Sequence, residues 1–308
     1  MVGECSRFEA ANSIAWADKI LRHLPGPGHI TLGSGLSAAV WTVALRGPRK
    51  ILKISILIPI YNEFRTLPEV LERVRLAPLP NGCTKEIIVI DDGSTDGTAE
   101  ILSQYERAGI IIGHYSAINS GKGMAIRAGL KLASGDVVLI QDGDLEYDPR
   151  DYTRIVEPIL QGRADIVYGS RFLATPAGMA LKNRIANWIL TVTANLLYGA
   201  HLTDEATAYK AIRISILREL QLDCRRFEFC PEITAKVRRL GYRIQEVPIS
   251  YNARGIADGK KIRTRDGFEA LWTLLKYRLA PQWMLLRSEL KQKSILPAPC
   301  HDTLRSTF

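Results

Sequence analysis

Short apolar runs rich in β-branched residues recur along the chain from Ile51 onward. Four of them stand out, at residues 54–59, 86–92, 137–140 and 166–169. Each is short, nearly all apolar and bounded by turn residues, which is typical of a strand buried on both faces. Stretches with helical character lie between them, at residues 66–76, 98–108 and 123–133. Strands that alternate with helices at this spacing predict an α/β fold, a mostly parallel sheet with helices on both faces.

The first fifty residues follow a different pattern. Pro25-Gly26-Pro27-Gly28 breaks any regular element, and a basic hinge spans 46–53. We therefore expect an N-terminal extension over residues 1–50 and a main domain over residues 51–250. The acidic residues Glu4 and Glu9 argue against a secretory signal peptide. Residues 29–45 are the best candidate for a membrane span, but Gly and Ser interrupt them, so we expect no span.

Polar and acidic residues follow each predicted strand. Ligands of such sheets bind at the carboxyl ends of the strands. This rule selects Pro59, Tyr61 and Glu63 after the first strand and Asp91 and Asp92 at the second. It also selects Asp142, Asp144 and Glu146 after the third and Arg171 after the fourth. We expect these groups to converge on one edge of the sheet.

Asp142-Gly143-Asp144 carries the sharpest chemical signal. Two carboxylates one residue apart, on a turn after a buried strand, can both address one divalent cation. Mg²⁺ and Mn²⁺ take oxygen ligands and bridge to substrate phosphates. Glu146 lies two residues further on and can supply a third oxygen. The pattern predicts a metal site formed by Asp142, Asp144 and Glu146.

Two further segments indicate a nucleotide ligand. Asp91 or Asp92 can accept hydrogen bonds from a nucleobase or a ribose. Asn119-Ser120-Gly121-Lys122-Gly123 precedes a predicted helix, where Gly121 leaves room for a ligand and Lys122 can meet a phosphate. The full G-x-x-x-x-G-K-[ST] pattern is absent, which disfavours a P-loop kinase.

Charge and cysteine content narrow the possible partners. The net charge of +9 and the isoelectric point of about 9.3 indicate an anionic partner: nucleic acid, a lipid surface or a phosphorylated substrate. The 5 cysteines include no C-x-x-C pair. A zinc site and a disulfide framework are therefore unsupported, and a reducing cytoplasm is the expected compartment.

Taken in order, these motifs resemble the family-2 glycosyltransferases of the GT-A fold, a nucleotide-sugar-binding fold. The resemblance is closest to the polyprenyl-phosphate group, which includes the dolichyl-phosphate mannose synthases. It covers about residues 54–278. Several motifs in the same order are more specific evidence than any one motif. The segments that carry it are 56–63, 90–98, 119–123, 141–149, 169–171, 227–233, 241–244, 246–251 and 259–262.

The resemblance implies roles for individual residues. Pro59, Tyr61, Glu63 and Asp91 would line the nucleoside pocket, and Asp142, Asp144 and Glu146 would face a metal that bridges the diphosphate. Asp142, Asp144 and Arg171 are the expected catalytic residues. Basic groups around the donor and acceptor phosphates would be Arg171, Lys182, Arg254 and Lys260. Two departures are visible: relatives often carry Gln where this chain has Glu146, and residues 203–206 match only loosely.

The expected reaction is an inverting transfer of mannose or glucose from GDP-mannose or UDP-glucose to a polyprenyl or dolichyl phosphate. A lipid monophosphate is largely dianionic at neutral pH and attacks without a general base. An alternative is a sugar or protein hydroxyl acceptor, which a free-standing aspartate base near Asp204 would favour. A second alternative is a non-catalytic protein that binds nucleotide-sugars, against which the intact Asp142 and Asp144 argue.

The C-terminal region, residues 251–308, is basic and amphipathic. Residues 268–290 and 184–198 are apolar with a helical period, and Trp283 and Met284 would form an inserted tip. Tryptophans beside Lys and Arg suit a helix that lies on anionic lipid. We therefore expect peripheral attachment to the cytoplasmic face of a membrane, and no nucleic-acid partner.

Overall fold

A computed structural model describes residues 51–174, 178–253 and 264–287 of the chain. These described residues belong to one compact unit. Its strands are β1 Leu52–Ile60, β2 Cys83–Asp91, β3 Ile112–Tyr115, β4 Val137–Ile140, β5 Ile166–Ser170, β6 Lys210–Arg213 and β7 Gln245–Pro248. Its α-helices are α3 Leu67–Leu76, α4 Thr98–Arg107, α5 Lys122–Leu132, α6 Tyr152–Leu160, α7 Leu181–Tyr198, α8 Ile214–Glu219, α9 Phe229–Arg239 and α10 Thr264–Leu279. Short 3₁₀ turns are η1 Pro149–Asp151 and η3 Gln282–Met284.

The strands form a 7-stranded sheet in the order β3-β2-β1-β4-β6-β5-β7. All neighbours run parallel except β6, which is antiparallel to both β4 and β5. The α/β prediction and its mostly parallel sheet are confirmed. Because β5 runs in the same direction as β4, the residues after both strands lie at the same edge as those after β1 and β2.

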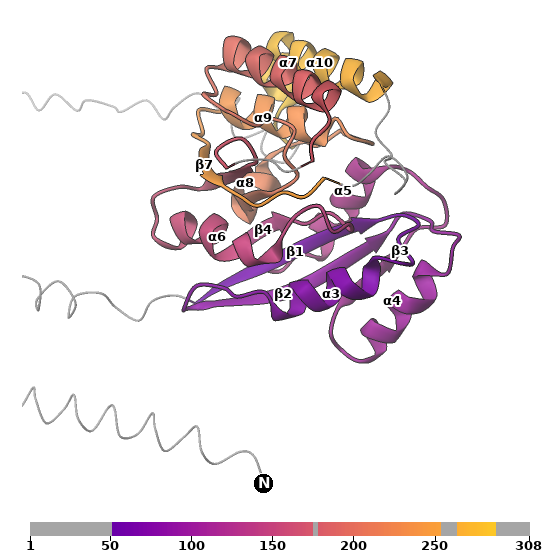
Figure 1. Ribbon diagram of the computed structural model, residues 1–308. Coiled ribbons are helices and arrows are strands. Elements are labelled where there is room, and N and C mark those ends of the chain that lie inside the picture. Colours follow the sequence, from indigo (N-terminus) through magenta and orange to yellow (C-terminus); the bar gives the residue numbers. More distant parts are fainter. Residues whose placement is uncertain (1–50, 175–177, 254–263, 288–308) are drawn as a thin grey trace, which may run out of the picture. The chain divides into compact units, whose positions relative to one another are not determined.

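Side chains of β1 alternate between two hydrophobic layers. Ile54, Ile56 and Ile58 point into a core covered by α3, α4 and α6, whereas Leu57 points into a second core covered by α5, α8 and α9. This period of two places helices on both faces of the sheet, as the sequence predicts (Figure 1). A proline fits in this central strand because Pro59 lies beyond the last residue of β1 that pairs with β4, which is Leu57.

A third layer lies over α9. Helices α7 and α10 pack against each other and against α9 through Leu190, Ala194, Ala235, Ala270 and Leu274 (Figure 1). The predicted helix over 268–290 proves shorter. The helix α10 ends at Leu279, because Pro281 lacks the N–H that a further turn needs. Among the described helices none combines the length and the apolar character needed to cross a bilayer. The segment 29–45 lies outside the described residues.

Candidate active site

The turns after β1 and β2 are joined to each other. Asn62 adopts a left-handed conformation with φ of 51°. Its backbone N–H donates to Ser94 Oγ at 2.8 Å, and its side-chain Oδ1 accepts from the Thr95 N–H at 2.8 Å. The Glu63 N–H donates to Thr98 Oγ1 at 3.0 Å. These bonds fix the half-buried Tyr61 and Glu63 beside the end of β2.

The two aspartates at the end of β2 are buried and hold loops. Asp91 accepts from the backbone N–H and the hydroxyl of Ser94 at 3.0 and 2.5 Å. Asp92 accepts from the N–H groups of Ser120 and Gly121 at 2.9 and 2.7 Å. Burial raises the pKa of Asp92, although these two hydrogen bonds act in the opposite direction. Sequence reasoning missed this loop-holding role, and contact of either aspartate with a nucleoside stays a prediction.

Asp142 and Asp144 stand on a tight turn directly after β4. The glycine between them is required by space, because a Cβ on Gly143 would lie 2.6 Å from Ile60 Cγ2. Both aspartates are half-buried, and Asp144 Oδ1 accepts from the Glu146 N–H at 3.1 Å. The carboxylates therefore lie at the edge of the sheet formed by the carboxyl ends of the parallel strands, where the sequence places them.

A buried amide anchors this turn from below. Gln141 Oε1 accepts from the hydroxyls of Tyr152 and Tyr209 at 2.7 and 2.6 Å, and its Nε2 donates to the Asp142 carbonyl at 2.9 Å. Gln141, Tyr152 and Tyr209 are fully buried. Buried and satisfied networks of this kind rigidify the backbone they hold. Sequence reasoning includes Gln141 in the segment 141–149 but assigns it no role, since a single glutamine after a strand carries no pattern.

Lys122, the first residue of α5, forms an ion pair with Asp142. Each of the two side chains is 20% exposed. Burial by itself lowers the pKa of Lys122, but the negative charge of Asp142 contributes to a net rise, so the ammonium stays charged. The sequence predicts phosphate contact for Lys122, and the structure adds this partner.

Arg171 is joined to Asp204 in a buried, two-pronged ion pair. Its Nε and Nη2 donate to the two carboxylate oxygens, each at 2.7 Å, and its backbone N–H donates to Oδ2 at 3.0 Å. The Asp204 N–H in turn donates to Glu246 Oε1 at 3.0 Å. Arg171 also lies over the ring of Tyr251, with its guanidinium carbon 5.1 Å from the centroid. Asp204 is therefore committed to Arg171 and is not the free-standing base that a hydroxyl acceptor would favour.

Tyr251 links this ion pair to the turn that carries Asp142, Asp144 and Glu146, which we call the acidic turn. Its hydroxyl donates to Glu146 Oε2 at 2.8 Å. Burial raises the pKa of Tyr251, and the neighbouring Glu146 raises it further, so the phenol stays protonated and remains a donor. One oxygen of Glu146 is thus oriented by an aromatic residue from the segment after β7.

The remaining predicted residues lie in β1, near the start of α7 and in the loop before α5, or fall outside the described residues. Pro59 is buried within β1, and Lys182 is exposed near the start of α7. Gly121, with φ of 98°, rests directly on the backbone of Arg225, whose carbonyl oxygen would lie 2.5 Å from an added Cβ. Arg254 and Lys260 lie outside the described residues.

The acidic turn fits a hard divalent cation of the kind that substrate phosphates help to bind. In the part of the chain that the structure describes, no three His, Cys, Asp or Glu side chains form a ready cluster for a metal ion. Mg²⁺ in phosphate-transfer sites usually takes one or two carboxylates and completes its shell with water and phosphate oxygens. Asp142 and Asp144 match this donor set. Glu146 as a third ligand stays a prediction.

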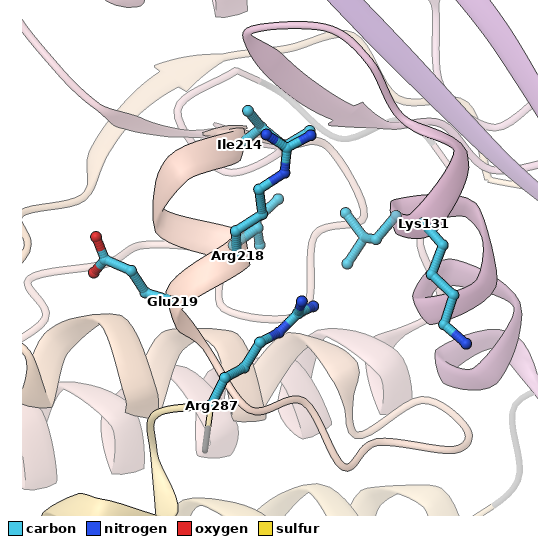
Figure 2. Close-up of a pocket in the computed structure, with 7 residues that line it drawn as sticks. Lys131, Ile214, Arg218, Glu219 and Arg287 are labelled. Carbon is cyan, nitrogen blue, oxygen red and sulfur yellow. The ribbon is translucent and has the colours of Figure 1, made fainter. Parts of the chain in front are cut away.

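A separate cavity of about 600 Å³ lies away from the acidic turn. It is lined by the end of α5, by α8 and by Arg287, as Figure 2 shows. Its walls carry Lys131, Arg218 and Arg287 over apolar side chains, and Glu219 is held by the Tyr242 hydroxyl at 3.0 Å. This cavity contains none of the residues predicted for the site.

Comparisons with known proteins identify the family and agree with the fold. The family described as glycosyl transferase family 2 matches residues 55–221. An undecaprenyl-phosphate mannosyltransferase of Micrococcus luteus is 31% identical over 251 residues, which is 78% of this chain and 99% of that protein. A dodecaprenyl-phosphate galacturonate synthase of Rhizobium johnstonii is 30% identical over 209 residues, 67% of this chain and 61% of that protein.

Solved structures show the same fold at lower identity. Glucosyl-3-phosphoglycerate synthase from Mycobacterium tuberculosis, in complex with UDP, has a TM-score of 0.58 at 21% identity and covers 82% of this chain and 87% of its own. A second structure of that enzyme, with Mn²⁺, UDP and glucosyl-3-phosphoglycerate, has a TM-score of 0.56 at 22% identity and covers 75% of this chain and 81% of its own. The segment that matches the family, residues 55–221, runs from within β1 to just past α8 and includes the acidic turn. The chain is a glycosyltransferase of family 2, with the GT-A fold and with relatives among the polyprenyl-phosphate sugar transferases.

Proposed function

We propose that this glycosyltransferase moves a hexose, mannose or glucose, from a nucleotide-sugar to a polyprenyl phosphate at a membrane surface, with inversion at the anomeric carbon. The donor, GDP-mannose or UDP-glucose, binds at the carboxyl edge of the sheet. The acceptor is a lipid that carries a phosphate monoester. Relatives whose names specify undecaprenyl or dodecaprenyl phosphate support this acceptor class.

On the donor side, Tyr61, Glu63 and Asp91 take the nucleoside, and Asp142 and Asp144 take a divalent cation, Mg²⁺ or Mn²⁺. The complexes of the structural neighbour with Mn²⁺ or Mg²⁺ and UDP support such a cation. When bound, the cation neutralises the charge that develops on the departing diphosphate. Gln141 and the tight turn at Gly143 hold both carboxylates in place for this.

On the acceptor side, the buried acids favour a phosphate over a hydroxyl. A hydroxyl acceptor needs a general base, whereas a phosphate monoester is already largely dianionic at pH 7. Asp204 and Glu205 are both fully buried, and Asp204 is paired with Arg171. Neither of them is placed to take a proton from an incoming hydroxyl.

Helix α7 supplies the first half of a membrane-facing surface. Leu181, Ile185, Trp188 and Leu196 recur at helical spacing on its outer side, and Trp188 is 64% exposed. The opposite side, which packs inward, carries Asn187, Leu190, Thr191 and Ala194. The solvent side of this helix is therefore more apolar than the buried side, which is the reverse of an ordinary surface helix.

Helix α10 repeats this pattern beside α7. Phe268, Trp272, Leu275 and Leu279 follow the same spacing on its outer side, and Trp272 is 66% exposed. Figure 1 shows both helices stacked on α9. Because they pack on α9 with their inner sides, the two stripes face away from it. We call these stripes together the apolar face. Lys182, Arg184, Lys276 and Arg278 on the same helices suit anionic headgroups.

The position of the apolar face is the observation that carries the lipid acceptor. Near the start of α10, Asp266 Oδ1 lies 3.6 Å from Arg226 Nη2. Arg226 in turn packs against Gly121 of the segment 119–123, which contains Lys122 and which we call the lysine loop. Just before α7, Gly178 approaches Ala253, two residues beyond Tyr251. Both helices thus begin beside the edge of the sheet that carries the acidic turn. A lipid whose chain lies in the membrane would present its phosphate there, and Lys182, Arg254 and Lys260 are the proposed phosphate ligands.

The test is a donor and acceptor panel with the full-length protein. GDP-mannose and UDP-glucose, each labelled in the sugar, are incubated with Mn²⁺ and undecaprenyl phosphate in detergent micelles, with undecaprenol as the matched acceptor without phosphate. We expect label in the organic extract only with the phosphorylated lipid. Equal labelling of undecaprenol, or transfer confined to a soluble hydroxyl acceptor, would overturn the proposal.

A further inference from the structure

The ion pair between Lys122 and Asp142 joins two parts of the donor site that have different ligands. Lys122 is the first residue of α5 and lies in the lysine loop, the segment 119–123, where a diphosphate fits. Asp142 belongs to the acidic turn, where a cation fits. The lysine therefore occupies one of the two carboxylates proposed to bind the cation.

The backbone of the lysine loop is held from two sides. Asp92 accepts from the N–H groups of Ser120 and Gly121, and the Met124 N–H donates to the Arg225 carbonyl at 3.0 Å. A Cβ on Gly123 would lie 2.9 Å from the Arg225 carbonyl carbon, so the loop has no room to shift toward that backbone. Movement at this position is left to the Lys122 side chain, a flexible stem that ends in a compact charge.

Charge balance then links the two ligands. While the ammonium neutralises Asp142, an approaching divalent cation meets a positive charge beside its carboxylate. A nucleoside diphosphate offers the ammonium a new anionic partner and brings phosphate oxygens to the cation. The diphosphate thereby draws Lys122 away from Asp142, which opens that carboxylate to the cation. The cation in turn takes over Asp142, which leaves Lys122 to the diphosphate.

We propose that Lys122 is a built-in counter-ion that couples cation binding to donor binding. It holds Asp142 while the donor is absent and passes to the diphosphate when the donor arrives, which exposes Asp142 to the cation. This inference rests on the proposed donor site. Because coupling between two ligands is reciprocal, the cation must also raise the affinity for the nucleotide by the same factor.

The experiment measures Mn²⁺ binding to the full-length protein by electron paramagnetic resonance, with and without UDP or GDP. The variant is Lys122→Met, with Lys122→Gln as a second form should the first fail to fold. The matched control is Lys131→Met, because Lys131 lies on the same helix but lines the separate cavity of Figure 2. Thermal melts establish that each variant is folded.

For the wild type and Lys131→Met, we expect weak Mn²⁺ binding that tightens at least tenfold with nucleotide, after correction for the Mn²⁺ that free nucleotide takes up. For Lys122→Met or Lys122→Gln, Mn²⁺ alone should bind at least fivefold more tightly than to the wild type, and the gain from nucleotide should shrink. Unchanged or weaker Mn²⁺ binding by both variants overturns the inference. Failure of the wild type to bind either nucleotide with Mn²⁺ would instead overturn the proposed donor site.

Discussion

Two ion pairs lie at the same edge of the sheet and differ in almost every physical property. Arg171 and Asp204 make two parallel hydrogen bonds, and their side chains are 10% and 0% exposed. Lys122 and Asp142 make a single contact between half-buried groups. Arginine suits a fixed and bidentate pairing, whereas lysine is a point charge that exchanges partners readily. The first pair therefore holds the loops after β5 and before β6 in place, whereas the second suits the proposed exchange of partners with ligands.

The largest expected effect comes from breaking the buried pair. Asp204→Ala leaves the Arg171 guanidinium buried without its counter-charge, and removal of one partner of such a pair typically destabilises a protein by about 3–5 kcal/mol. We expect a loss of this size in the free energy of unfolding, measured by urea denaturation.

Asp165→Ala is the matched control, since Asp165 pairs with Arg213 at 2.7 Å but is 57% exposed. Exposed pairs contribute roughly 0.2–1 kcal/mol, so the control should lose less than about 1 kcal/mol. Equal losses in the two variants would contradict the structural role of Asp204.

The second expected effect concerns catalysis rather than stability. Asp144→Asn removes one carboxylate charge from the acidic turn while the amide oxygen can still accept from the Glu146 N–H. Loss of one group that stabilises developing charge lowers turnover by about 10²–10³-fold in comparable sites. We expect a loss of at least this size in sugar transfer at saturating Mn²⁺, with an unchanged urea midpoint.

Asp148→Asn serves as the control for that variant, because Asp148 lies beyond the turn and pairs with the exposed Arg150 at 2.5 Å. Its turnover should stay within about twofold of the wild type. Turnover of Asp144→Asn close to that of the control would contradict the assignment of Asp144 as a metal ligand.

The smallest expected effect concerns binding of the apolar face to lipid. Full burial of one large apolar side chain contributes about 1.5–3 kcal/mol, and an interfacial tryptophan gains part of that. Replacement of both Trp188 and Trp272 by serine should weaken binding to vesicles that contain anionic lipid by at least tenfold, measured by co-sedimentation. Transfer to a detergent-solubilised acceptor should change little.

Leu76→Ser provides the control, because Leu76 is 69% exposed on α3 and does not belong to the apolar face. It should leave vesicle binding unchanged. If the tryptophan variant and this control sediment alike, the apolar face does not contact lipid.

Sequence patterns predicted the features that are local in the chain. The strands β1, β2, β4 and β5 follow from continuous apolar runs, and the acidic turn follows from its place after β4. By contrast, β6 has the sequence Lys-Ala-Ile-Arg, which resembles a polar segment. It is buried because Lys210 lies 3.6 Å above the ring of Tyr168 and donates to the Glu205 carbonyl at 2.9 Å, contacts that no local pattern reveals.

The same distinction explains which contacts within the site were missed. Gln141 is held by Tyr209, which is 68 residues away in the chain, and Asp204 reaches Arg171 across 33 residues. These partners meet only because β6 returns antiparallel between β4 and β5. Motifs and strand positions predict the groups proposed to touch ligands, whereas the groups that hold them depend on the completed sheet.

The most direct test of the account is the chemical linkage in the lipid product. Undecaprenyl phosphate is converted with unlabelled donor and Mn²⁺, and the extracted lipid is examined by ³¹P nuclear magnetic resonance. The account predicts that the phosphate monoester signal is replaced by that of a phosphodiester, with the anomeric carbon of one sugar joined to a phosphate oxygen for each donor consumed. A phosphate monoester signal that persists while the sugar is found on a hydroxyl would contradict it.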